Sequence, residues 1–206
     1  MNASKLFVLP LLAALLIGAQ TLSFAKEVST KDEVTKKTTI KTDSFKKETV
    51  YLFPEINYSN IPKKEKLEML PDYKELDNAL IKNPIIYQIQ VTVNKEGEKS
   101  FKLICAFYSD ENNSYKVTSM YDSNGYEIGT NFYYDVASMK AKKEIFVYQG
   151  LVKTKKIGYQ YDPYISLEVL EKSKNSGMAI KVFTNNKDKY FHIPAYYIQA
   201  VLETVK

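Results

Sequence analysis

Two adjacent stretches in the middle of the chain alternate between apolar and polar side chains. Residues 85–93 place apolar side chains at every second position, and residues 100–108 do the same with Phe, Leu, Cys and Phe. A period of two is typical of a β-strand with one buried face. Between the two stretches, Gly97 supplies the positive φ that a tight hairpin loop often requires. We therefore predict an antiparallel hairpin whose apolar face includes Cys105.

Further runs of β-forming residues lie on both sides of this hairpin. Residues 49–58 form a first run, bent by Pro54, and the turn at 122–125 contains Asn-Gly, the strongest short hairpin signal. The other runs are residues 115–121, 126–128, 131–136, 144–149 and 151–161. We predict an antiparallel meander of roughly six to eight strands with one face covered.

The last part of the chain combines helix and strand signals. Asp162-Pro163 or Ser166 can open a helix that ends near Asn175, and Gly177 suits the left-handed position that follows it. Residues 178–184 and 189–193 are typical of two strands joined by a turn. Pro194 then begins a terminal helix. The apolar stripe of that helix is Ile198, Val201, Leu202 and Val205.

Two other short helices are predicted at residues 63–70 and 73–82, between Pro62 and Pro84. The predicted fold class is therefore α+β. Two or three short helices pack on one face of the meander, and the chain ends in a helix–hairpin–helix unit.

The N-terminus carries an apolar run over residues 6–17, preceded by Lys5 and followed by Ser23-Phe24-Ala25. Small residues at the first and third of these last positions are the pattern that a signal peptidase recognises. A membrane-spanning helix needs about 20 apolar residues, more than this run provides. We therefore expect residues 1–25 to be a cleaved signal peptide, with no transmembrane segment left afterwards. The protein is expected to be exported, to a periplasm or to the cell exterior.

Residues 26–48 are rich in Lys, Thr and acidic side chains, and their few apolar residues follow no helical or strand period. Such a segment is typical of a flexible tether. A functional alternative is a spacer or an arm that adsorbs to an anionic surface. Residues 49–206 are then predicted to form a single domain.

The amino-acid composition argues against several classes of function. All 29 basic residues are lysine, and the formal net charge is +5. Because arginine is the usual bidentate reader of guanine, sequence-specific nucleic-acid binding is not expected. The single Cys105 excludes an internal disulfide, and we expect its thiol to be buried.

Candidate catalytic residues are few. A nucleophilic pair would have to be Cys105 with His192, but both lie in predicted strands and lack a surrounding nucleophile motif. Asp135, Glu144 and Asp162 are candidate carboxylates of a glycosidase, without a specific pattern. No glycine-rich phosphate motif or metal-ligand spacing occurs, so we expect no cofactor and no metal.

Tyrosine is the compositional feature that best suits a binding surface, because it joins an apolar ring to a polar tip. The candidate binding residues are Tyr133, Tyr159, Tyr161, Tyr164 and Tyr196. Coding bias together with packing at strand edges explains the same number of tyrosines. We therefore hypothesise an exported, non-catalytic binding or interaction protein whose partner is an envelope protein or a glycan.

Two alternatives stay open. One is a small envelope hydrolase whose carboxylates converge only in the folded chain. The other is a structural subunit that pairs through a sheet edge. The sequence leaves the ligand and the oligomeric state undetermined.

Overall fold

The computed structural model describes residues 28–58, 61, 85–109, 117–129, 143–149, 152–185 and 188–206, with the backbone alone for residues 109, 143–149 and 152–160. The leader, the two helices expected within 63–82 and the strand expected at 131–136 lie outside the described residues.

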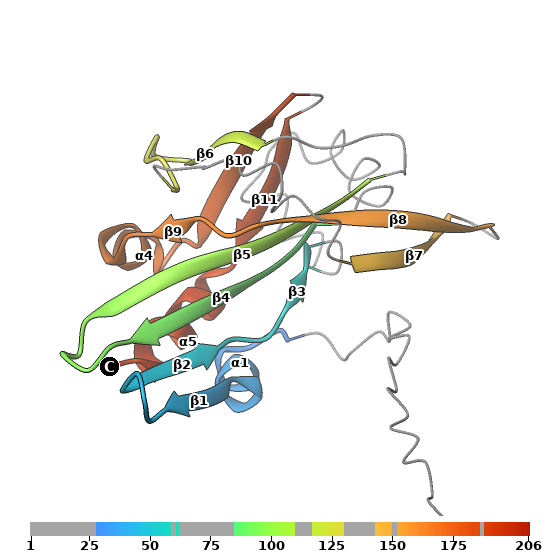
Figure 1. The fold of residues 1–206 in the computed structure, drawn as a ribbon. Helices are drawn as coiled ribbons and strands as arrows, with labels where there is room; N and C mark the ends of the chain where they lie inside the picture. The colour runs from blue at the N-terminus through green and yellow to red at the C-terminus, as the bar shows by residue number, and fades with distance from the viewer. Residues whose placement is uncertain are drawn as a thin grey trace, which may run out of the picture.

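The described chain forms two antiparallel sheets and three helices (Figure 1). The large sheet has eight strands in the order β1-β2-β4-β5-β8-β7, with β3 paired to β4 and β9 to β5, and the small sheet has the order β11-β10-β6. The strands are β1 Thr39–Asp43, β2 Glu48–Leu52, β3 Ile56–Asn57, β4 Ile85–Val93, β5 Lys99–Ser109, β6 Val117–Asp122, β7 Lys143–Gln149, β8 Val152–Tyr161, β9 Tyr164–Ile165, β10 Met178–Thr184 and β11 Lys189–Ile193. The helices are α1 Lys31–Lys37, α4 Leu167–Ser173 and α5 Ala195–Thr204. The predicted α+β class is confirmed.

The β4–β5 hairpin forms as its alternation predicts. Ile85 pairs with Phe107 at one end and Val93 with Lys99 at the other. Gly97 has φ 81° in the loop between them. The side chains of alternate residues, including Cys105, are buried on one face, as expected.

The small sheet joins strands that are far apart in the sequence. The β10–β11 hairpin was expected, and β6 adds to its other side with Lys181 opposite Tyr121. The Asn-Gly turn after β6 also forms, with Gly125 at φ 82°. Beyond it, the expected strand at 126–128 is reduced to one bridge between Tyr121 and Glu127. The Asp122 carboxylate accepts the backbone N–H of Tyr126, which fixes the turn.

The C-terminal helix–hairpin–helix unit is confirmed. Ser166 caps α4 by accepting the backbone N–H of Val169, and Gly177 follows the helix at φ 75°. Pro194 precedes α5, whose predicted apolar stripe is buried.

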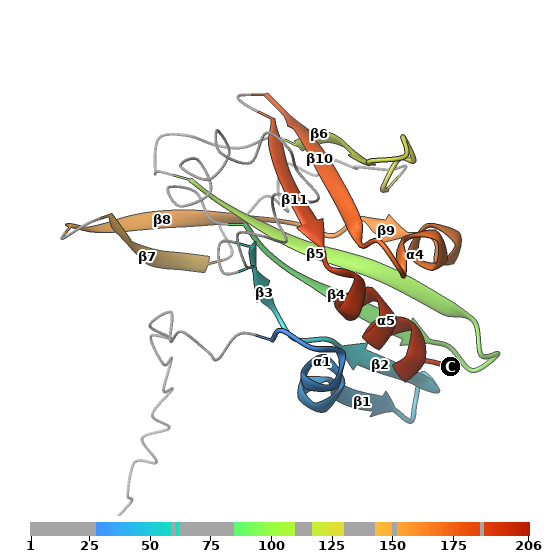
Figure 2. The same ribbon diagram turned by 180° about the vertical axis from the view of Figure 1, so that it is seen from behind.

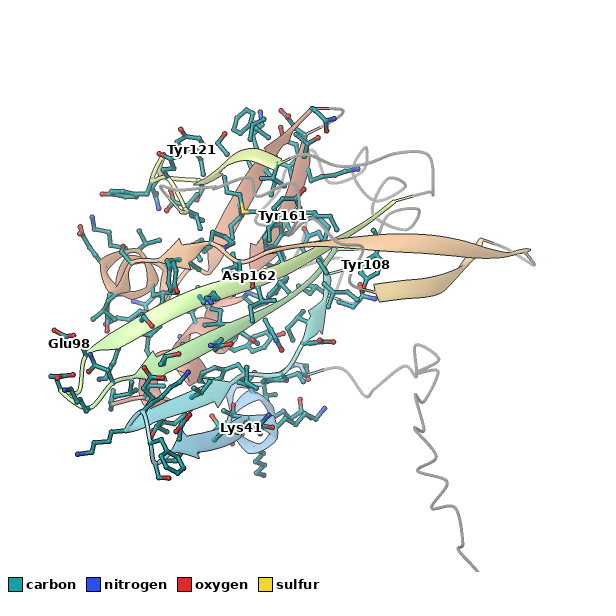
Figure 3. All side chains as sticks on the ribbon, in the orientation of Figure 1. Lys41, Glu98, Tyr108, Tyr121, Tyr161 and Asp162 are labelled. Atoms are coloured by element: carbon teal, nitrogen blue, oxygen red, sulfur yellow. The ribbon has the colours of Figure 1, made fainter. Side chains whose placement is uncertain are left out.

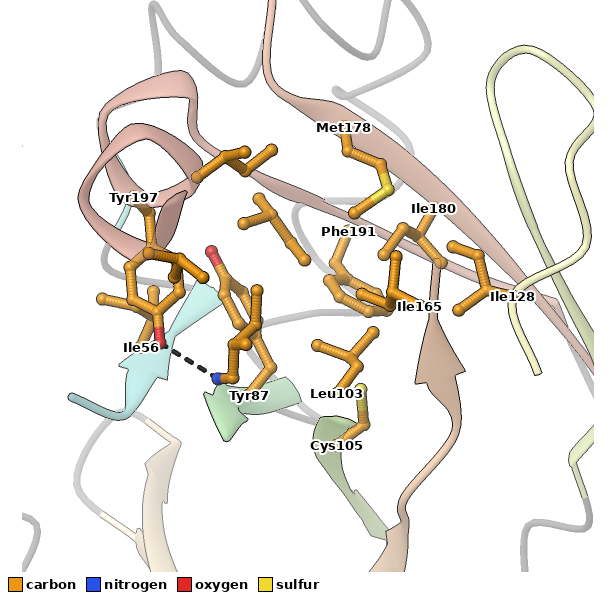
Figure 4. Close-up of a cluster of buried hydrophobic side chains, with 14 of the residues drawn as sticks. Ile56, Tyr87, Leu103, Cys105, Ile128, Ile165, Met178, Ile180, Phe191 and Tyr197 are labelled. Carbon is orange, nitrogen blue, oxygen red and sulfur yellow. Dashed lines mark hydrogen bonds between the residues drawn. The ribbon is translucent and has the colours of Figure 1, made fainter. Parts of the chain in front are cut away.

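The main core lies between one face of the large sheet and a layer made of α5 and the small sheet. Figure 2 shows α5 and β11 in front of β4 and β5, whereas Figure 1 shows the opposite face of these strands turned toward the viewer. Leu103 and Phe191 meet in this layer, together with Met178 and Ile180 (Figure 4). One face of the sheet is therefore covered. On the other face Ile86 and Tyr108 are buried as well, whereas Gln88, Gln90 and Thr92 are half-buried.

The flexible tether expected at 26–48 is wrong for residues 28–48. They form α1 and β1, and β1 pairs with β2 from Thr39 opposite Leu52 to Asp43 opposite Glu48. The side chain of Val34 is fully buried in the core. Val34 is the one buried residue of α1, and every residue of β1 is exposed although its backbone pairs with β2. The search for a periodic apolar face therefore missed both elements.

Candidate functional site: an open sheet face

The candidate nucleophile Cys105 is fully buried, and desolvation, followed by the nearby charge of Asp162, raises the pKa of its thiol well above the ordinary value. Nucleophilic chemistry needs the thiolate, which this environment disfavours. His192 is also fully buried, and its Nδ1 lies 3.4 Å from the Tyr58 hydroxyl. Both residues therefore serve the core, as the sequence analysis favoured.

The carboxylates give no acid–base pair among the described residues. Of the candidates, Asp162 is exposed, the side chain of Glu144 is not among those described, and Asp135 lies outside the described residues. Two of the described carboxyl groups, Glu168 and Glu203, have a displaced pKa. In both the pKa is lowered, chiefly by a hydrogen bond from a lysine. A general acid needs a raised pKa instead. The described part of the chain also holds no group of three metal-ligating side chains.

The five predicted tyrosines do not form one surface. Tyr161 is buried, with its ring 5.7 Å from that of Phe107, and belongs to the core. Tyr196 is half-buried, and its hydroxyl donates to the Val28 carbonyl at 2.9 Å. Tyr133 lies outside the described residues, and only the backbone of Tyr159 is described.

Tyr164 is the predicted residue that the structure leaves at the surface, with 57% of its area exposed. It lies on β9, whose pairing with β5 sets it opposite Lys102. The Lys102 Nζ lies 5.3 Å from the centre of the Tyr164 ring, within the range of a cation–π contact. The backbone N–H of Leu103 donates to Pro163 at 2.8 Å, which holds the segment before Tyr164 against β5.

Strand pairing extends this contact into a row across the large sheet. Leu52 pairs with Gln90, Gln90 with Lys102, and Lys102 with Tyr164. Paired residues of neighbouring strands project from the same face. Four strands therefore contribute to one row, which is about 14 Å long at the usual spacing between strands.

Polar side chains flank the row on the same face. The next positions along the strands are Gln88 opposite Ile104 and Thr92 opposite Ser100. The Gln90 amide donates to the Thr92 hydroxyl at 3.4 Å. We call this set, Leu52, Gln88, Gln90, Thr92, Lys102, Ile104 and Tyr164, the open face. It offers amide and hydroxyl groups, one cation and one aromatic ring, and no described helix covers it in Figure 1.

The small sheet carries a second group of rings, which the sequence analysis did not select. Lys181 lies between Tyr121 and Tyr190 on the paired strands, and its Nζ is 4.4 Å from the Phe183 ring centre. Hydrogen bonds to Tyr190 and Asp188 raise the pKa of Lys181. This lysine is already engaged within the protein, so the open face is the stronger candidate. The alternation of side chains within each strand is the sequence signal that could have assigned the rings of the small sheet to an outer face.

Comparison with protein-family models, with curated proteins and with solved structures finds no match. No helix in the described part of the chain is long and apolar enough to cross a membrane.

Proposed function

We propose that this chain is an exported, non-catalytic binding protein of a bacterial envelope or exterior, and that the open face binds a glycan. The observation that carries the proposal is the row from Leu52 to Tyr164, which sets an exposed ring, a lysine and the Gln90 amide on successive strands of one face. The apolar run and small-residue site in residues 1–25 support export.

The chemistry of the open face favours a hydroxyl-rich ligand. Gln88, Gln90 and Thr92 provide hydrogen-bond donors and acceptors without a fixed charge. Tyr164 provides an apolar surface with a polar tip, and Lys102 adds one positive charge. A stable protein interface usually has a larger apolar and aromatic centre than this face offers.

The first experiment measures retention of the exported protein on insoluble cell-wall glycan. The chain is expressed with its own leader and recovered from the exported fraction, where its N-terminus is expected near Lys26. We expect Tyr164→Ala to weaken retention about tenfold, because it removes the one exposed ring of the row. Lys102→Gln is expected to weaken retention less.

Tyr126→Ala is the matched control, because Tyr126 is also an exposed tyrosine beside a lysine, Lys172, but lies outside the open face. Its retention should equal that of the unaltered protein. Equal retention of the Tyr164 variant would reject the open face as the binding site. Capture of an envelope protein without glycan would reject the ligand class, and release of soluble fragments would favour the hydrolase alternative.

A further inference from the structure

The turn between β1 and β2 holds the most exposed large hydrophobic side chain among the described residues. Phe45 is 99% exposed there, and Ile40 on β1 is 57% exposed. A single exposed apolar residue is common on soluble proteins. The surroundings of Phe45 set it apart from such isolated cases.

The turn is built so that the ring is held outward. The Asp43 carboxylate accepts the backbone N–H groups of Phe45 at 2.9 Å and Lys46 at 3.0 Å. Lys47 completes the turn in the left-handed region at φ 55°. Immediately after it, Glu48 pairs with Asp43 at the base of the hairpin. Phe45 is therefore presented by an ordered turn rather than by a loose end.

Two lysines follow Phe45 in the chain. They are Lys46 and Lys47. A third, Lys41, is labelled in Figure 3 and lies on β1 opposite Val50, before the turn. All three side chains are exposed. The acids of the hairpin are Asp43, whose carboxylate faces the turn, and Glu48, which is half-buried. We call Phe45, Lys46 and Lys47 the hairpin tip.

The neighbouring β4–β5 loop adds no net charge at this end of the sheet. Lys95 forms an ion pair with Glu96 at 3.3 Å, and the Glu98 carboxylate accepts from Asn94 at 2.8 Å. Lys99 follows at the start of β5 and balances Glu98 in sign. The positive charge nearest Phe45 is therefore that of the hairpin tip itself.

We propose that the hairpin tip is a contact site for an anionic membrane surface. An aromatic ring on an interface favours the boundary between headgroups and acyl chains, and lysines beside it are attracted to anionic headgroups. One apolar anchor alone binds a bilayer weakly, and adjacent basic residues supply the second attraction. The site lies at the β1–β2 turn, apart from the open face, so the protein can contact a membrane and a glycan independently.

The test uses the absence of tryptophan from the chain. The Phe45→Trp variant places a single indole in the hairpin tip, and its emission is recorded with vesicles of phosphatidylglycerol and phosphatidylcholine and with phosphatidylcholine vesicles alone. We expect a blue shift with the anionic vesicles and none with the neutral ones. Adding Lys46→Gln or Lys47→Gln should weaken binding about fivefold for each charge removed.

Tyr126→Trp is the control, because it places the indole on an exposed turn far along the chain from the hairpin tip. Its emission should not change with either vesicle. An unchanged emission from the Phe45→Trp variant would overturn the proposal, as would equal shifts with both vesicles or in both variants. A blue shift that grows with protein concentration without vesicles would reject it in favour of contact between two copies of the chain.

Discussion

The Tyr197→Phe variant, which lacks a single oxygen atom, is expected to lose about 2–4 kcal/mol of unfolding free energy. The Tyr197 ring is fully buried, and its hydroxyl donates to the Pro54 carbonyl at 3.0 Å and accepts the Ile89 N–H at 3.1 Å. Figure 4 shows the second of these bonds. The variant would leave the buried Ile89 N–H without this acceptor, and its desolvation would not be offset.

The hydroxyl of Tyr197 provides hydrogen bonds at a point where the strand pairing of the large sheet is interrupted. Leu52 is the last residue of β2 to pair with β4, and Ile56 of β3 resumes the pairing. Between them Phe53 donates to the Ile89 carbonyl at 3.1 Å, while the Ile89 N–H turns to Tyr197. Burial raises the pKa of Tyr197, so the hydroxyl keeps the proton that it donates to Pro54. The Tyr197 side chain thus links α5 to β4 and to the segment between β2 and β3.

Urea unfolding of the two proteins measures this loss, with Tyr196→Phe as the matched control. Tyr196 is the preceding residue, is only half-buried and donates one hydrogen bond to Val28, so its variant should lose about 0.5–1 kcal/mol. Equal losses in both variants, or a loss below about 0.5 kcal/mol for Tyr197→Phe, would show that the bridge does not stabilise the sheet.

The parts of the fold that were predictable from the sequence are those with a local signal. The β4–β5 hairpin was found from alternation and from Gly97, and α4 from Ser166 and Gly177. Each of these signals lies within a few residues of the element it defines. Local backbone chemistry was therefore sufficient for them.

Long-range pairing was not predictable in the same way. Nothing near β6 indicates that it adds to β10 rather than to a neighbour in sequence, because the choice depends on how the whole core packs.

The N-terminal segment shows the converse error, because a local signal was present in the sequence and was overlooked. Thr30 and Glu33 have the spacing of a capping box, and Glu33 accepts the Ser29 N–H at 2.9 Å, but the lack of a periodic apolar face led to the prediction of a tether.

Of the residues of the open face, the sequence analysis selected only Tyr164. Tyrosine at a strand or helix end indicated both Tyr161 and Tyr164, and the two lie on opposite sides of the large sheet: one in the core and one on the open face. Which side each ring takes depends on the pairing of β8 and β9 with β5. Gln90 and Lys102 became part of the site only once those pairings were known.

Cys105 is expected to react with a thiol reagent more than a thousandfold more slowly in the folded protein than in urea, since reaction requires opening of the core. The thiol lies on β5 opposite Tyr87, is fully buried and has a raised pKa. Reaction is therefore limited both by access and by the small thiolate fraction. A catalytic thiol has the opposite properties, exposure and a lowered pKa.

Because Cys105 is the single cysteine of the chain, its modification can be followed directly by release of a chromophore from an aromatic disulfide. The control places a thiol at the exposed Ser123, as Ser123→Cys in a Cys105→Ala background, and this thiol should react at nearly the same rate with and without urea. Rapid labelling of folded Cys105 would contradict a core role and would restore the nucleophilic pair with His192 as a hypothesis. Slow labelling, together with unchanged glycan retention in Cys105→Ala, would place this thiol outside the binding function.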